Sequence, residues 1–199
     1  MLERVQDRSL MQMLSLDDET RLNGAARALA QWAIVDDYDT VLDLDCGDGR
    51  LLHYLSKRYS LRACGIASNP EQARELRCKM PDAEVFYARK EDIPWRSEAF
   101  NAVFYQMKNT DERSGAFLRE VVRVLKPGGQ VLISLTGLPE VLSGFAATMG
   151  FADEDRVRRS ELLRWMEEAG LRDVSWRITG LTTGLAMGFK QFEAEECAE

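Results

Sequence analysis

Residues 41–52 read VLDLDCGDGRLL and contain the turn that decides the fold. Residues 41–44 form an apolar strand, Gly47 and Gly49 mark a tight turn, and a helix starts directly after it. Such a turn can hold a polar ligand, because its backbone N–H groups and the helix N-terminus point toward the same space. Asp45 stands where such loops usually carry a glycine.

Six further apolar segments repeat the alternation of strand and helix: residues 62–66, 84–88, 100–106, 130–135, 174–178 and 185–192. The last two lie close in sequence, which is typical of an antiparallel pair at a sheet edge. Strands that alternate with helices predict an α/β fold with a doubly wound, mostly parallel sheet of seven strands. Ligands of such sheets bind beyond the carboxyl ends of the strands, near the switch point in strand order.

Helix signals fill the gaps between the strands. Asn69, Pro70 and Glu71 give one helix a cap, a proline at its first position and an acid in its first turn. A second helix is expected to be capped by Asp17 or Asp18, with its apolar face formed by Leu22, Ala25, Ala26, Leu29, Trp32 and Ala33. The remaining helices are an amphipathic one over residues 2–14, one with its buried face at 117–125, capped by Asp111 and ended by the turn at 126–129, and a late one stopped by Gly170.

Composition and charge exclude several classes of protein. The 199 residues, 45% hydrophobic and 30% charged, describe one globular domain with a sizeable core. The net charge of −7 argues against a nucleic-acid partner, since phosphate contacts need clustered Lys and Arg. The four cysteines form no Cys-x-x-Cys pair, which favours reduced thiols over disulfides or a metal site: Cys46, Cys64, Cys78 and Cys197.

The sequence carries no sign of export or of a membrane span. Glu3, Arg4 and Asp7 interrupt any apolar run near residue 1, and no stretch approaches the ~18 apolar residues of a membrane helix. We therefore expect a cytoplasmic protein that binds neither membrane nor nucleic acid, and we leave a homodimer open.

Three segments together resemble the class I S-adenosylmethionine-dependent methyltransferases. VLDLDCGDG at 41–49 resembles the family's first motif, usually an acid followed by Gly-x-Gly-x-Gly. EDIPW at 91–95, with Phe100, resembles the third-strand loop, and LREVVRVLKPGGQVLIS at 118–134 resembles the helix, turn and fifth strand. The likeness covers roughly residues 20–192. It implies a Rossmann-like methyltransferase sheet, S-adenosylmethionine as cofactor, and an enzyme that methylates a small molecule.

The same resemblance implies how the chain is organised. Residues 1–36 would form helices that cap the site, residues 37–192 the Rossmann-like domain, and residues 193–199 an acidic tail. Residues 136–159 would help to select the substrate. Methyl transfer needs proximity and alignment more than acids or bases, so no catalytic residue and no metal ligand is assigned.

Cofactor-binding residues follow from the matched motifs. Asp43 would lie near the methionine ammonium, and Gly47 and Gly49 would let the backbone approach the cofactor closely. Cys46 takes a position that small residues usually fill. The expected cofactor-binding set is Asp43, Asp45, Cys46, Gly47, Gly49, Ser68, Lys90, Glu91 and Gln106.

Four positions depart from the family pattern: Asp45, Ala67, Arg89 and Asn101. Asp45 replaces the first glycine of the loop, and its charge could either repel or attract the cationic cofactor. Ala67 stands where an acid usually accepts hydrogen bonds from the ribose hydroxyls. Arg89 replaces an Asp that usually contacts the adenine amine, and Asn101 a frequent Asp after Phe100. Losing a hydrogen bond to a charged acceptor costs about 1.5–3 kcal/mol, roughly tenfold to a hundredfold in affinity. Ser68 or Asn69 is the candidate replacement for the ribose acid.

Two other functions fit the same residues less well. A dinucleotide site needs a third glycine where Leu52 stands, and Ala67 removes its ribose acid too. Asp43 and Asp45 resemble the acid pair of haloacid-dehalogenase-like phosphatases, but Gly47 stands where that family has Thr or Val. No later pair of acids completes a magnesium site there, so both alternatives are rejected. The alternative that stays open is a degenerate methyltransferase fold used as a binding or dimerisation module.

Polar residues outside the turn have simpler interpretations. His53, the only histidine, is expected to be a partly buried helix residue rather than a base. Four residues follow the fourth strand, where related enzymes position the nucleophile, and each alone is best explained as loop polarity: Tyr105, Gln106, Lys108 and Asn109.

Overall fold

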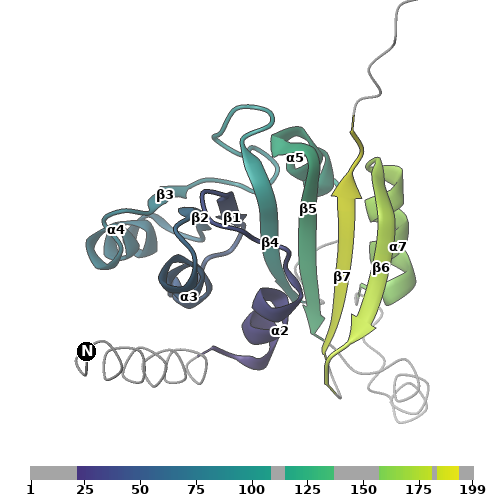
Figure 1. The fold of residues 1–199 in the computed structure, drawn as a ribbon, viewed down its shortest axis with the longest axis horizontal. Coiled ribbons are helices and arrows are strands. Elements are labelled where there is room, and N and C mark those ends of the chain that lie inside the picture. Colours follow the sequence, from purple (N-terminus) through teal and green to yellow (C-terminus); the bar gives the residue numbers. More distant parts are fainter. Residues whose placement is uncertain (1–21, 109–114, 137–156, 181–182, 193–199) are drawn as a thin grey trace, which may run out of the picture.

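The computed structural model describes residues 22–108, 115–136, 157–180 and 183–192, which form one sheet of seven strands (Figure 1). The strand order is β3-β2-β1-β4-β5-β7-β6. Neighbouring strands from β3 to β5 are parallel, whereas β7 runs antiparallel to both β5 and β6. The strands are Thr40–Asp43 (β1), Arg62–Ala67 (β2), Glu84–Tyr87 (β3), Phe100–Lys108 (β4), Leu125–Thr136 (β5), Leu171–Ile178 (β6) and Thr183–Lys190 (β7).

The predicted fold class is confirmed. The chain builds outward from β1 to β2 and β3, then returns to place β4 on the other side of β1. The switch point of the sheet therefore lies between β1 and β4, and residues 45–49 follow β1 at that point. We call residues 45–49 the glycine turn. The antiparallel strand β7 lies one position in from the edge, with β6 outside it.

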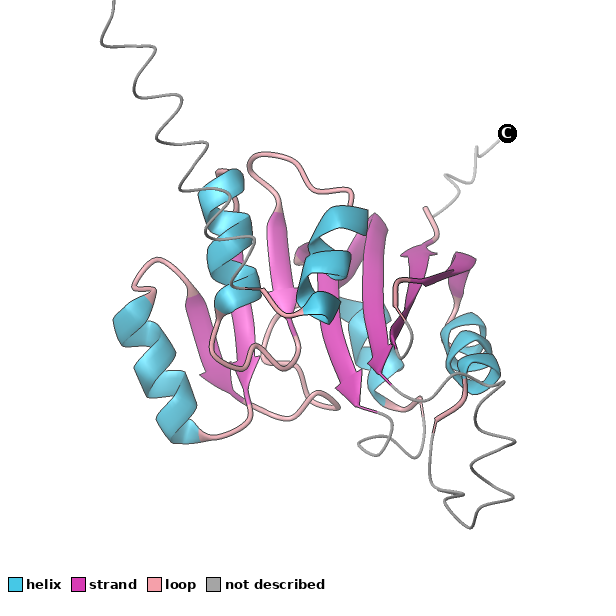
Figure 2. Ribbon diagram, turned by 90° about the horizontal axis from the view of Figure 1, so that it is seen from below, coloured by secondary structure: helices cyan, strands magenta, loops and turns pink. Residues whose placement is uncertain are grey.

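Helices cover both faces of the sheet (Figure 2). One face packs against Gly24–Trp32 (α2), Arg50–Arg58 (α3) and Pro70–Lys79 (α4). The other packs against Phe117–Val124 (α5) and Arg159–Glu168 (α7). Side chains alternate between faces along a strand, so each central strand is apolar on both sides. No described helix is long and apolar enough to cross a bilayer.

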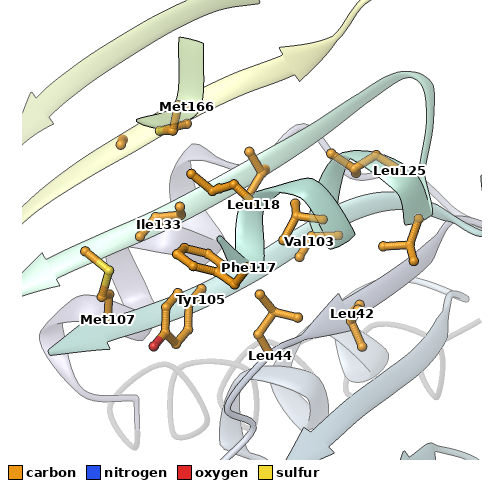
Figure 3. Packing of buried hydrophobic residues seen from close by; sticks show 14 of the residues in the cluster. Leu42, Leu44, Val103, Tyr105, Met107, Phe117, Leu118, Leu125, Ile133 and Met166 are labelled. Atoms are coloured by element: carbon orange, nitrogen blue, oxygen red, sulfur yellow. The ribbon is translucent and has the colours of Figure 1, made fainter. Parts of the chain in front are cut away.

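The core beneath α5 shows why the sequence forms these layers (Figure 3). Phe117 and Leu118 of α5 are 1% and 0% exposed and pack on Val103 and Ile133 of the sheet. The ring of Tyr105 lies 5.3 Å from that of Phe117, edge to face. The Leu and Val stripe predicted for this helix therefore forms core, as the helical spacing of its apolar residues requires.

Helix boundaries agree with the sequence signals where those signals are local. Asn69 caps α4 by accepting from Gln72 N at 2.8 Å, and Gly170 follows α7 with a φ of 95°. The predicted start of α2 was wrong: its cap is Asn23, whose Oδ1 accepts from Ala26 N at 2.7 Å. Several predictions lie outside the described residues: the helix at 2–14, the caps Asp17, Asp18 and Asp111, Asn109, Cys197, most of 136–159 and the tail 193–199.

Helix α2 is attached to the sheet at both of its ends. Beyond its C-terminus, Gln130 Oε1 accepts from Ile34 N at 3.2 Å, and Gln130 Nε2 donates to the Ile34 carbonyl. At its N-terminus, Asn23 Nδ2 donates to Gln106 Oε1 at 3.0 Å. Because Gln130 lies near the start of β5 and Gln106 near the end of β4, α2 extends along the strands between their N-terminal and C-terminal ends.

Residues 126–129, which we call the β5 turn, lie at the N-terminal ends of the parallel strands. The glycine turn lies at the C-terminal ends. α5 ends at Val124, as predicted from this segment, and the chain enters β5 at once. Lys126 Nζ donates to Asn101 Oδ1 at 2.8 Å, and Thr40 N donates to the same oxygen at 3.0 Å. Asn101 therefore ties the starts of β1, β4 and β5 together, which explains its departure from the family pattern structurally.

Candidate functional site

The glycine turn has the backbone geometry of a ligand cradle. Gly47 and Gly49 have φ values of 52° and 80°, which residues other than glycine rarely adopt. A Cβ at Gly47 would meet nothing nearer than the Asp45 carbonyl at 3.9 Å. At Gly49 a Cβ would lie 2.7 Å from Leu76 Cδ2, so this glycine is needed for packing against α4. The turn thus leaves open space above Gly47 and closes beneath Gly49.

Asp43 is a fully buried carboxyl group at the end of β1. Its Oδ1 accepts weakly from Asp45 N at 3.4 Å, and no hydrogen-bond partner reaches Oδ2 from the described part of the chain. Burial, with a smaller contribution from the charge of Asp45, raises the pKa of Asp43 from 3.8 to about 7. A buried acceptor without a partner is costly, so a bound donor or cation would be stabilising here.

Asp45 turns sideways from the glycine turn toward the end of β2. Its Oδ1 accepts from Ser68 Oγ at 2.8 Å. Ser68 is itself held, because its N–H donates to Gln72 Oε1 at 2.9 Å. Asp45 is not among the described residues with positive φ, so an acid stands at the family's first glycine without backbone strain.

Cys46 packs the turn against β2. Its N–H donates to the Ile66 carbonyl at 3.0 Å, and a Cβ at Gly65 would lie 2.9 Å from its Sγ. Burial and the carboxylates of Asp43 and Asp45 raise the pKa of the Cys46 thiol above its usual range. A thiol held neutral in this way is a poor nucleophile, so the side chain serves packing.

Lys90 and Glu91 follow β3, and their side chains engage protein partners. Lys90 Nζ lies 3.1 Å from the hydroxyl of Tyr105 and 5.3 Å from the centre of its ring. Glu91 pairs with Arg89 at 3.5 Å, with 39% and 83% of the two side chains exposed. The structure therefore joins Lys90 to β4 and leaves Glu91 and Arg89 largely in water.

Gln106 lies beside a second buried polar group that the sequence did not single out. Gln106 of β4 pairs in register with Ser134 of β5, and alternation places both on the face that α2 covers. Ser134 is 1% exposed, and its Oγ has no partner within the described residues. Sequence reasoning missed Asn23 and Ser134, and only a Ser in an apolar strand could have signalled one of them. Tyr105, interpreted as loop polarity, is instead a buried residue of β4.

His53 lies close to the glycine turn, because its N–H donates to the Gly49 carbonyl at 2.8 Å. It is exposed on α3, which corrects the expectation of a partly buried residue. With Tyr54, Lys79 and Met80 it lines a cavity of about 270 Å³ between the start of α3 and the end of α4. No group of three His, Cys, Asp or Glu side chains in the described ranges is arranged to hold a metal ion.

Comparison with known proteins agrees with this architecture. Residues 41–129 match the family model of a methyltransferase domain. The trans-aconitate 2-methyltransferase of Azoarcus sp. (strain BH72) is 32% identical over 127 residues, which cover 60% of this chain and 46% of that protein. The chain spans less than half of the length of the curated relatives it matches.

Solved structures share the fold at low sequence identity. A chain in the complex of the Haloferax volcanii Trm112 methyltransferase activator has a TM-score of 0.69 and 20% identity, and the match covers 89% of this chain and 93% of that one. The phosphoethanolamine N-methyltransferase 2 of Haemonchus contortus, solved with S-adenosyl-L-methionine, has a TM-score of 0.62 and 14% identity, covering 82% and 51%. Residues 41–129 are therefore similar to a methyltransferase domain, and the sheet order is that of the methyltransferase fold which these solved structures share.

Proposed function

We propose that this chain binds S-adenosylmethionine in the glycine turn and transfers its methyl group to a small-molecule acceptor. The observation that carries the proposal is the unpartnered Oδ2 of Asp43, buried beside a turn of two glycines with positive φ. A buried carboxylate in this position requires a cationic or hydrogen-bonding partner to be stable when ionised.

The residues of the turn fit this cofactor. Its ammonium group would neutralise Asp43, and Gly47 leaves the space into which a ligand could approach the backbone. Asp45 does not fill that space, because its side chain turns toward Ser68. Asp43 and Gly47 are therefore proposed as the main contacts, with Asp45, Gly49 and Ser68 around them and Cys46 as packing beneath.

Bound there, S-adenosylmethionine supplies a methyl group on a positively charged sulfur. The work of the protein is then to hold and orient. Gln106, half-buried near the end of β4, offers a polar side chain to an acceptor oxygen or nitrogen. Lys90 fixes the hydroxyl of Tyr105 at the same edge of the sheet. Helix α2, attached through Asn23, covers this side of the sheet.

Calorimetry with S-adenosylmethionine and S-adenosylhomocysteine tests the proposal on the purified chain. We expect dissociation constants in the micromolar range, which correspond to a binding free energy on the order of −8 kcal/mol. The matched control is Glu71→Gln, which removes an exposed charge from the first turn of α4 and should bind as the parent does. Folded protein that binds neither ligand at millimolar concentration would contradict the proposal and favour the non-catalytic module.

A further inference from the structure

Two departures from the family pattern meet at one place in the fold. Ala67 ends β2 and is 0% exposed, so no carboxylate stands at the position from which nucleoside-binding sheets usually reach the ribose hydroxyls. Asp45 enters the same region from the glycine turn, because its Oδ1 accepts from Ser68, the residue after Ala67. The acid missing from β2 thus has a counterpart 22 positions earlier in the chain.

We propose that Asp45 is the ribose-binding carboxylate of this chain, moved from the end of β2 to the turn after β1. The proposal rests on the function proposed above and assigns one of its residues a role. Ala67 is the other half of the exchange, since a methyl group there leaves room for the Asp45 side chain. Two acids in these positions would repel each other, whereas a glycine at 45 with an alanine at 67 would leave the ribose without an acceptor.

The surroundings hold Asp45 in the orientation that this role needs. Cys46 N–H bonds the Ile66 carbonyl at 3.0 Å and fixes the turn to β2. Gln72 holds Ser68, and Ser68 holds Oδ1 of Asp45. Oδ2 of Asp45 accepts no hydrogen bond from the residues that the structure describes, and the residue is half-buried. This oxygen can therefore accept from a vicinal diol. A preorganised carboxylate loses little freedom when it binds.

A reciprocal exchange of the two residues gives the sharpest test. Binding of S-adenosylhomocysteine is measured by calorimetry for the parent, Asp45→Gly, Ala67→Asp and the double variant. Each single change should weaken binding roughly tenfold to a hundredfold, by loss of a charged acceptor or by repulsion between two acids. The double variant should return to within about threefold of the parent, because it restores one acid in one place.

A second measurement covers the case in which Asp at the buried position 67 prevents folding. The 2′,3′-dideoxy analogue of S-adenosylhomocysteine lacks the proposed hydrogen-bond donors. The parent should bind it at least tenfold more weakly than S-adenosylhomocysteine, whereas Asp45→Asn should bind both about equally. Glu71→Gln, a neutralised acid near the same edge, should discriminate as the parent does.

The outcomes separate this inference from the proposed function. If the parent binds S-adenosylhomocysteine and Asp45→Asn binds it equally well, the role of Asp45 is overturned and the proposed function stands. If the folded parent binds no S-adenosylhomocysteine at millimolar concentration, both fail. If the double variant folds and binds no better than the weaker single variant, the exchange of positions is overturned.

Discussion

Two glycine-bearing turns at opposite edges of the sheet use the same residue for opposite purposes. In the glycine turn, a Cβ at Gly47 would meet open space, and the carboxyl group beside it has an unpartnered oxygen within the described chain. In the β5 turn, a Cβ at Gly129 would lie 2.8 Å from the Lys126 carbonyl oxygen and 3.1 Å from that of Phe100. The glycine turn thus leaves open space next to a polar atom without a partner in the described chain. The β5 turn uses its glycine to let neighbouring backbone pack closely.

The difference teaches that a glycine alone does not indicate function. The polar groups around the β5 turn bond to one another, as Lys126 and Thr40 do to Asn101. Such a turn contributes to stability and has nothing to offer a ligand. Burial of Asp43 beside the glycine turn lowers the stability of the ligand-free protein, and a bound ligand could restore that stability. The largest energetic contrast should therefore come from Asp43.

Asp43→Asn should flatten the pH dependence of stability in the ligand-free protein. With a pKa of about 7 when folded and 3.8 when unfolded, Asp43 binds its proton more tightly in the native state, so stability falls as pH rises from about 4 to about 7. The full difference is about 4 kcal/mol. Urea unfolding at pH 5 and pH 8 measures the part of this difference that falls between those two pH values, about 3 kcal/mol, in both proteins.

Asp48→Asn is the matched control for this prediction. Asp48 belongs to the same turn but pairs with Arg50 at 2.7 Å with 56% of its side chain exposed, so its charge remains in contact with water. It should retain the parental slope. An Asp43→Asn protein with the same slope as the parent would show that the buried carboxyl group is not the origin of the contrast.

Gly129→Ala should cost about 3 kcal/mol of stability, at the upper end for overpacking, because the atoms it meets are backbone oxygens that cannot move aside. Urea unfolding at one pH measures the loss. Affinity for S-adenosylhomocysteine should stay at the parental value, since the β5 turn lies at the other edge. Gly24→Ala, with nothing within 4 Å of its Cβ and a helical position, should instead be neutral or slightly stabilising. Lost affinity in a folded Gly129→Ala protein would break the distinction between the turns.

Gly47→Ala should show the reverse pattern. Its φ of 52° costs a side chain only about 1 kcal/mol, and no neighbouring atom obstructs the methyl group. The methyl group would, however, occupy the space proposed for the ligand and weaken binding of S-adenosylhomocysteine at least tenfold. Thermal unfolding and calorimetry on the same preparation separate the two effects. Parental affinity would mean that the ligand does not approach the backbone at Gly47.

Local signals explain how much of the fold was predictable. Asn69 and Pro70 fix the start of α4 through contacts within one helical turn, and Gly170 ends α7 in the same local way. Apolar runs predicted the central strands, because both faces of those strands are buried. The start of α2 was misplaced because Asp17, Asp18 and Asn23 are all good caps, and the pattern of apolar residues does not choose among them.

The arrangement of side chains at the site was less predictable, because it depends on residues that are distant in sequence. The hydrogen bond between Ser68 and Asp45 spans 23 positions, and that between Asn23 and Gln106 spans 83. Lys90 Nζ lies 3.1 Å from the Tyr105 hydroxyl, a contact between residues 15 positions apart that the motifs do not encode. The cofactor contacts themselves stay predictions.

The side-chain hydrogen bonds that attach α2 to the sheet differ between its two ends. At the C-terminal end, Gln130, which is 3% exposed, makes two hydrogen bonds with the backbone of Ile34. At the N-terminal end, Asn23 donates an exposed hydrogen bond to Gln106. An exposed bond of this kind contributes about 1 kcal/mol or less, so thermal motion would break it often without disturbing the strands. Burial of Leu22 and Ala26, which are 4% and 3% exposed, therefore holds the N-terminal end of α2 on the sheet more firmly than this bond does.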